Sequence, residues 1–287
     1  MVMGYPRPTC EGILKACSEL RLRPTMRKIG IWTLKLFLIL SAVAALYVAV
    51  LVFPSPLFAH TQTYGSYRVY SDEPLPADLA RRIDDLDRRV QGMEHAPPAA
   101  SQRIFLCGPK KYSFFAFLLR KNPASLAIGL SAANESFVSV ERVQLFAERN
   151  QGVLRHTRFE GNLAEVVAHE IAHFNSVHAL GLRSHIDQPL WKSEGWAEYQ
   201  ANLATIRSDP DYDLGSRIEQ LLDDRYWAGN SAFARRMWRY QLLVEFLGEV
   251  QGYRLVDLSR DEVTESFASQ EMLAWYNGDD SLGEPKP

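Results

Sequence analysis

The longest run of apolar residues extends from Gly30 to Phe53 and contains a single charge, Lys35. At about 1.5 Å per residue, its 24 positions make a helix of roughly 36 Å, enough to cross a bilayer core of about 30 Å. A buried core helix is the alternative, but apolar side chains on every face favour a membrane span. The pattern therefore predicts a transmembrane helix in which Lys35 extends its side chain to the lipid headgroups.

The charges on the two sides of this run differ. Four basic residues precede it closely, whereas the first Lys or Arg after it is Arg68. The positive-inside rule predicts a cytoplasmic basic tail at residues 1–28, a signal anchor at 29–53 and an extracytoplasmic remainder. A cleaved signal peptide is the competing interpretation, although the run is longer than a usual signal core and no clear cleavage site follows it. Met1 and Met26 are alternative starts of translation.

The part after the run divides into a stalk, a domain and a tail. Residues 54–65 are rich in proline and polar side chains and are expected to form the stalk. The domain is expected at 66–280 and a flexible tail at 281–287.

The front of the domain shows both kinds of periodicity. Apolar residues at helical spacing predict a helix from about 78 to 91. The segment 112–119 is apolar but too short to span a membrane, and either type of element fits it. Alternating apolar and β-branched positions predict three strands, at 64–71, 103–107 and 137–140.

From residue 162 onward the pattern becomes helical. Asn162 is a good N-cap for a helix from Leu163 to about Ser176, with Glu165 at its third position as in a capping box. Further helices are expected at 194–206, 216–226, 231–250 and 261–275. This order predicts an α+β fold, with one N-terminal transmembrane helix and then a small domain that has a short mixed sheet in front and is mostly helical behind.

The overall charge is close to balance, since 32 Lys and Arg face 34 Asp and Glu. This composition argues against a protein that binds nucleic acid through a basic surface. The balance is an average, because residues 1–53 carry +5 and the remainder carries −7. Cys10 and Cys17 precede the apolar run and only Cys107 follows it, so the exported part is expected to have no internal disulfide and Cys107 to be buried.

The strongest chemical signal lies in the capped helix, where residues 169–173 read HEIAH. Residues four apart lie on one helical face, so His169 and His173 can bind the same cation. Glu170 is rotated by about 100° from His169 and can reach a water molecule on that cation. Neutral imidazoles suit Zn²⁺, and the neighbouring carboxylate suits a general base. Paired surface histidines are the alternative interpretation.

A catalytic zinc normally has a third protein ligand. Glu194 lies 21 residues after His173, which leaves room for the first helix to end and for a second, antiparallel helix to return a carboxylate. Glu198 lies one turn later on the same face and is an alternative ligand or a group that orients one. His178 and His185 lie at spacings that match no known third ligand, and each is expected to be a surface or loop residue.

HEIAH followed at this interval by WKSEGWAEY, at Trp191–Tyr199, resembles the gluzincin pattern of thermolysin-like and aminopeptidase-type zinc metallopeptidases. The residue pattern is most similar to that of the small peptidase MA-like domains. The resemblance covers mainly residues 160–205, with a weaker similarity at 239–247. It implies that Zn²⁺ is the cofactor and that Glu170 is the general base, with three metal ligands: His169, His173 and Glu194.

The resemblance also implies a group that stabilises the oxyanion of the tetrahedral intermediate. Tyr240 is the best candidate by position, followed by Tyr226 and Tyr212. The strand near 137–140 is, by the same resemblance, expected to be the sheet edge along which an extended peptide binds.

Together these observations predict a membrane-anchored zinc metallopeptidase that acts on a peptide or protein, with its catalytic domain outside a bacterial inner membrane. An intramembrane protease is not favoured, because His169 follows a polar stretch over 110 residues beyond the apolar run. The alternatives are an inactive or weakly active peptide-binding or assembly module of the same fold, and a zinc hydrolase of cell-wall amides. The intact Glu170 argues against an inactive module, since zinc binding does not require it.

Overall fold

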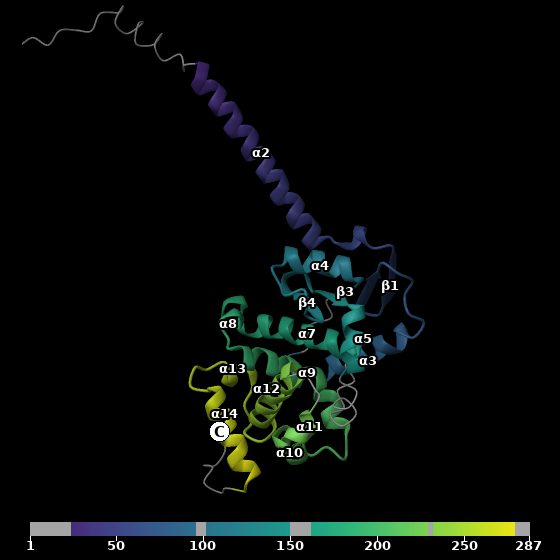
Figure 1. Cartoon of the computed structure of the whole chain (residues 1–287), viewed down its shortest axis with the longest axis vertical. Helices are drawn as coiled ribbons and strands as arrows, with labels where there is room; N and C mark the ends of the chain where they lie inside the picture. The colour runs from purple at the N-terminus through teal and green to yellow at the C-terminus, as the bar shows by residue number, and fades with distance from the viewer. Residues whose placement is uncertain (1–23, 96–101, 150–161, 229–231, 279–287) are drawn as a thin grey trace, which may run out of the picture. The chain divides into compact units, whose positions relative to one another are not determined.

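The structure is a computed structural model that describes residues 24–95, 102–149, 162–228 and 232–278. The chain divides into two compact units, Met1–Pro54 and Ser55–Pro287. In the first unit, helix α2 (Pro24–Val52) contains a segment, Ile31–Val52, that is long and apolar enough to cross a membrane (Figure 1). Most of the expected basic tail and the expected C-terminal tail lie outside the described residues.

The second unit contains a five-stranded sheet of mixed direction. The three central strands are parallel to one another, and each outer strand is antiparallel to its neighbour. Helix α3 (Leu79–Gln91) connects the first two parallel strands, as a parallel crossover requires. In spatial order the strands are β1 (His60–Tyr64), β2 (Tyr67–Ser71), β3 (Gln102–Cys107), β5 (Glu135–Ser139) and β4 (Ala127–Leu130).

Alternate residues of the strands face two different helical layers. Ile104 belongs to the core that α3 and α7 (Leu163–Leu180) form with one face of the sheet, and we call this the sheet-side core. Phe105 and Phe137 stack on the opposite face, with ring centroids 4.9 Å apart, under helix α4 (Pro109–Leu118). The sheet therefore lies between α4 and the layer of α3 and α7 (Figure 1).

The helical half is built around α9 (Leu190–Ser208), which packs against both α7 and α12 (Ala232–Glu249). Ala197 and Ala201 of α9 belong to the sheet-side core. Trp196 belongs instead to a second core, which α9 shares with the helices that follow it. One helix therefore contributes to both cores.

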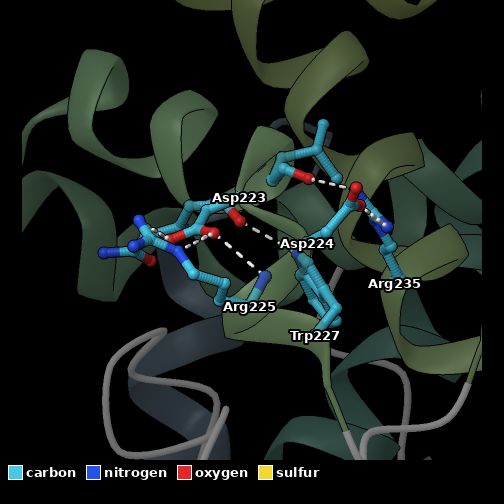
Figure 2. Close-up of polar contacts among 7 residues, drawn as sticks. Asp223, Asp224, Arg225, Trp227 and Arg235 are labelled. Atoms are coloured by element: carbon cyan, nitrogen blue, oxygen red, sulfur yellow. Dashed lines mark hydrogen bonds and ion pairs between the residues drawn. The ribbon is translucent and has the colours of Figure 1, made fainter.

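Shorter helices complete the unit. Figure 2 shows how α11 (Asp224–Trp227) is fixed: Asp223 accepts a hydrogen bond from the backbone amide of Arg225 at 2.9 Å, and Asp224 pairs with Arg235 of α12 at 2.7 Å. The shorter elements are α5 (Val140–Arg149), α8 (Leu182–Ile186), α10 (Leu214–Leu222), α11 (Asp224–Trp227), α13 (Leu255–Leu258), α14 (Glu265–Tyr276) and the 3₁₀ turns η1 (Ser55–Leu57) and η2 (Ser131–Ala133).

The front half differs from the sequence pattern in two places. The stretch 64–71, predicted as one strand, contains the last residue of β1, a turn at Gly65 with a φ of 54°, and the whole of β2. Its first strand uses residues 60–64, which the pattern assigns to the stalk. The apolar segment 112–119 is helical for most of its length, as part of α4.

The prediction that the strand near 137–140 is a sheet edge is wrong. β5 lies between β3 and β4, so its backbone groups pair on both sides. The edge of the described sheet on this side is β4, which the sequence pattern does not predict. β4 has four residues, including Gly129, and is too short for alternation to indicate a strand.

The back half follows the pattern more closely. Asn162 Oδ1 accepts a hydrogen bond from the backbone amide of Glu165 at 2.9 Å, which confirms the predicted cap of α7. α7 continues four residues beyond Ser176 to Leu180 and is followed by Gly181, whose φ is 82°. The helix expected at 216–226 is divided into α10 and α11, and the one expected at 261–275 begins at Glu265. The mixed α+β class is confirmed.

Candidate metal centre

α7 presents the two histidines of HEIAH on neighbouring turns. Ala168 and Ala172, each one position earlier, are buried in the sheet-side core and hold this part of the helix in place. The side chains of His169 and His173 keep 14% and 15% of their surface exposed. They are therefore anchored by the core and still accessible to solvent.

Packing fixes the position of α9, which carries the third side chain. A Cβ on Gly195 would lie 2.4 Å from the backbone oxygen of Tyr240, so a glycine is required for the close approach of α9 to α12. On the other side, the buried Arg89 of α3 donates hydrogen bonds to Ala201 O at 3.1 Å and Asn202 Oδ1 at 3.2 Å. Glu194 lies one turn inside α9 and faces the histidines of α7.

Within the described ranges, His169, His173 and Glu194 form the one group of three side chains that could hold a metal ion. Nε2 of His169 lies 3.1 Å from Nε2 of His173 and 3.3 Å from Oε2 of Glu194. Oε1 of Glu194 lies 3.7 Å from Nε2 of His173. Ligands about 2.1 Å from a tetrahedral zinc ion are about 3.4 Å apart. The spacing and the two-nitrogen, one-oxygen donor set of this metal group therefore fit zinc.

Glu198 does not belong to the metal group but contacts one of its members. Its Oε1 lies 3.3 Å from Nδ1 of His169, the ring nitrogen that faces away from the other two ligands. A carboxylate at this nitrogen fixes the tautomer and the ring orientation of a ligand histidine. The geometry therefore favours Glu194 as the third ligand and Glu198 as the residue that positions His169.

The charges of the metal group compensate one another. Burial disfavours a charged His169, but the carboxylates of Glu198 and Glu194 hold its pKa well above the usual value. Burial acts to raise the pKa of Glu194, but the hydrogen bond from His169 and the charges of both histidines lower it to about 2. Burial, together with the charge of His169, lowers the pKa of His173 to about 3. A metal ion bound here would displace the proton that the charged His169 carries on Nε2, the ring nitrogen that faces Glu194.

Glu170 lies between the metal group and the edge strand. Burial raises the pKa of Glu170 to about 7, although the charge of His169 acts in the opposite direction. The backbone amide of Gly129 in β4 hydrogen-bonds to this carboxyl group. A Cβ on Gly129 would lie 2.7 Å from Glu170 Oε2 and 2.5 Å from Phe174 Cε1, so only glycine lets the strand come this close.

His185 also lies at the metal group, contrary to the expectation of a surface or loop residue. It belongs to α8, and its ring centroid is 5.6 Å from that of His173. It is half-buried, burial lowers its pKa, and its Nδ1 has no hydrogen-bond partner among the described residues. The turn at Gly181 brings α8 back toward α7, and its geometry cannot be read from residue spacing. His178, by contrast, is exposed at the end of α7, as expected.

Lys121 is a second residue that the motifs do not indicate. It is exposed in the connection between α4 and β4. Burial and the charges within the metal group have larger effects on the pKa values of Glu194 and His173, but the positive charge of Lys121 also helps to lower both. It also acts on Glu170 in the same direction. The rim of the site is therefore basic at this point.

The three tyrosines considered for the oxyanion have contacts in the second core. Tyr240 packs there with its ring, and its backbone carbonyl is the atom nearest to Gly195. The hydroxyl of Tyr212 accepts a hydrogen bond from Arg217 at 2.8 Å, and the ring of Tyr226 lies 5.4 Å from that of Trp227. The role of Tyr240 stays a prediction.

The geometry brings together the residues that the sequence motifs single out as ligands. The resemblance to gluzincins itself rests on the sequence motifs alone. No protein-family model matches the chain, and the comparison with curated proteins gives no significant match.

Proposed function

We propose that this protein is a zinc-dependent peptidase of the gluzincin type, held at a membrane by its N-terminal apolar helix with the peptidase unit outside the cytoplasm. The observation that carries the proposal is the convergence of His169, His173 and Glu194, with Glu170 beside them. Two helices and two sequence motifs supply these side chains. A chance pair of surface histidines would need neither the third ligand nor the adjacent carboxylate.

The chemistry divides between the ion and the chain. When bound, Zn²⁺ would polarise the carbonyl of the scissile peptide bond and lower the pKa of a water molecule. Glu170 would accept a proton from the attacking water and pass it to the nitrogen of the leaving amine. The position of Glu170 suits both transfers, because its carboxyl group lies beside the metal group and against Gly129 of the edge strand. Glu198 would hold His169 in its ligand orientation throughout.

The edge strand β4 supports an extended peptide as the substrate. Within the described sheet, β4 pairs with β5 on one side only. A peptide that added to the other side as a further strand would be held by main-chain hydrogen bonds. Because Gly129 of β4 contacts Glu170, this peptide would pass directly beside the base.

The test combines metal analysis with hydrolysis by the full chain in detergent. We expect about one zinc ion per chain, and hydrolysis of a fluorogenic peptide library that stops when the metal is removed. Glu170→Gln should keep the zinc and lose at least about 100-fold in hydrolysis. Glu194→Ala should lose the zinc, whereas Glu219→Gln, at an exposed position of α10, should match the unmodified protein.

Three results would contradict the proposal in different ways. Undiminished hydrolysis by the Glu170→Gln variant would rule out the mechanism. Zinc binding with cleavage of cell-wall amides but not of peptides would identify a different hydrolase. Zinc binding with no hydrolysis of either substrate would favour a peptide-binding or assembly module.

A further inference from the structure

Helix α4 carries aromatic residues on both its buried and its exposed face. Its inner face supplies Tyr112, Phe115 and Ala116 to the interior. On its outer face, Phe117 keeps 79% and Phe114 keeps 45% of its surface exposed. Two large aromatic side chains exposed together on one face of a helix mark a patch that another surface commonly covers. The outer face of α4 is therefore expected to meet something other than water.

Basic residues flank these two rings. Lys110 is exposed one turn before Phe114, and the exposed Arg120 and Lys121 follow the end of the helix. The stretch from Pro109 to Lys121 contains no acidic residue. Aromatic rings among Lys and Arg side chains are typical of helices that lie in the interface of an anionic bilayer. The charge and the exposed rings together favour lipid over a protein partner.

The chain reaches α4 within a few residues of the apolar helix. Leu57 follows Val52, the last residue of α2, by five positions, and Lys111 of α4 donates a hydrogen bond to the backbone carbonyl of Leu57. The next residue, Phe58, stacks on Phe115 with ring centroids 6.2 Å apart. Five residues of chain span at most about 18 Å. Whatever orientation the two units take, α4 therefore stays within reach of a membrane that α2 crosses.

We propose that the outer face of α4 docks on the anionic surface of the membrane in which α2 is anchored. Phe114 and Phe117 enter the headgroup region, and Lys110 and Arg120 contact the lipid phosphates. This inference rests on the anchoring part of the proposed function and not on its peptidase chemistry.

Docking of α4 has a consequence for the metal group. Lys121 follows the helix directly, and its charge acts on both Glu170 and Glu194. The rim of the metal group is therefore held near the lipid surface when α4 is docked. Under the proposed function, the substrates within reach are the segments of membrane proteins that lie just outside the bilayer.

The test uses the full chain in lipid nanodiscs of phosphatidylcholine, with or without about 30% phosphatidylglycerol. Ser113, exposed on the outer face of α4, is changed to cysteine and labelled with the environment-sensitive fluorophore NBD. Cys10 and Cys17 are changed to serine, while the buried Cys107 stays unlabelled. The matched control carries the label at Glu219→Cys, an exposed position of α10.

We expect the emission of the label at position 113 to be at least about twofold higher, and shifted to the blue, in the anionic discs than in discs of phosphatidylcholine alone. The label at 219 should not change. The double variant F114S/F117S, checked for folding by circular dichroism, should show no increase in the emission of the label at position 113. In K110Q/R120Q this emission should be the same in discs with and without anionic lipid.

Other outcomes would overturn the inference. Equal, water-like emission at 113 and 219 in chains that co-elute with the discs would show that α4 does not touch lipid. A gain that appears in detergent and grows with protein concentration would identify a second copy of the chain as the occupant. Chains that do not co-elute with the discs would contradict the anchor itself, on which the docking rests.

Discussion

Nδ1 of His169 lies 3.3 Å from Oε1 of Glu198, a contact between the two helices of the metal group. Because this carboxylate orients the imidazole, we predict that Glu198→Gln lowers the affinity for zinc by about 10- to 100-fold. Competition with a chromogenic chelator measures the change. Glu219→Gln is the control and should bind zinc normally. Complete loss of stoichiometric zinc would instead make Glu198 a ligand.

The contact of Gly129 with Glu170 gives a second prediction. In Gly129→Ala, the new Cβ would displace the carboxylate of Glu170 or the ring of Phe174. We expect peptide hydrolysis to fall by about 10- to 100-fold while zinc content is unchanged. Gly108→Ala is the matched control, because its Cβ would have nothing within 4 Å. Normal hydrolysis by Gly129→Ala would mean that Glu170 does not depend on β4.

The approach of α9 to α12 gives a prediction about stability. In Gly195→Ala, the Cβ would lie 2.4 Å from a backbone oxygen that no rotamer change can move. We expect the free energy of unfolding to fall by about 1–3 kcal/mol, as measured by urea denaturation. In Gly215→Ala the nearest atom would be 3.5 Å away, so the same change at that helical position should have little effect. Equal stability of the two variants would disprove the tight contact.

Removal of the metal should also destabilise the fold. At a free zinc concentration 100 times Kd, binding to the native state contributes about 2.7 kcal/mol to the free energy of unfolding. We therefore expect a chelator to lower Tm by about 5–10 °C in differential scanning calorimetry. Glu194→Ala, which lacks a ligand, should have a lower Tm than the zinc-bound protein, and the chelator should not change it. A chelator effect of equal size in that variant would place the metal elsewhere.

Glu135 gives a prediction about pH. It is fully buried in β5, pairs with Arg103 at 2.8 Å, and burial raises its pKa to about 7 against the charge of Arg103. The native state then binds a proton more tightly than the unfolded state, whose pKa is about 4.5. This carboxyl group therefore stabilises the fold most fully below about pH 4.5, and that contribution is lost as the pH rises to about 7.

The measurement is the free energy of unfolding as a function of pH. Between pH 4.5 and 7, the unmodified protein should lose on the order of 2–4 kcal/mol relative to Glu135→Gln, because the amide does not titrate. Glu141→Gln, at an exposed position of α5, should keep the slope of the unmodified protein. Parallel curves for the protein and Glu135→Gln would contradict the raised pKa.

The parts of the site that depend on local spacing could be predicted from the sequence. His169 and His173 share a helical face because four residues make about one turn. The cap at Asn162 fixes where that helix begins, and the structure confirms it. Glu194 could be predicted as a ligand because the interval after His173 leaves room for a second helix. In the structure its carboxylate lies beside the histidines.

The parts that depend on the turn geometry and the strand order could not be predicted. His185 reaches His173 only because Gly181 turns the chain, and spacing does not contain that angle. Gly129 meets Glu170 only because β4 lies outside β5 in the sheet, and alternation along one strand says nothing about its neighbours. Those long-range relationships account for the misassigned edge strand and for the missed residues at the rim.

Because α9 contributes to both cores, the metal group takes its side chains from elements of both. His169 and His173 belong to the sheet side, whereas the position of Glu194 depends on the packing of Trp196 and Gly195 against α12. A bound ion would act as a reversible cross-link between the sheet side and the helical half. For the same reason, the smallest fragment able to keep the site must extend through α12, more than forty residues beyond the last ligand.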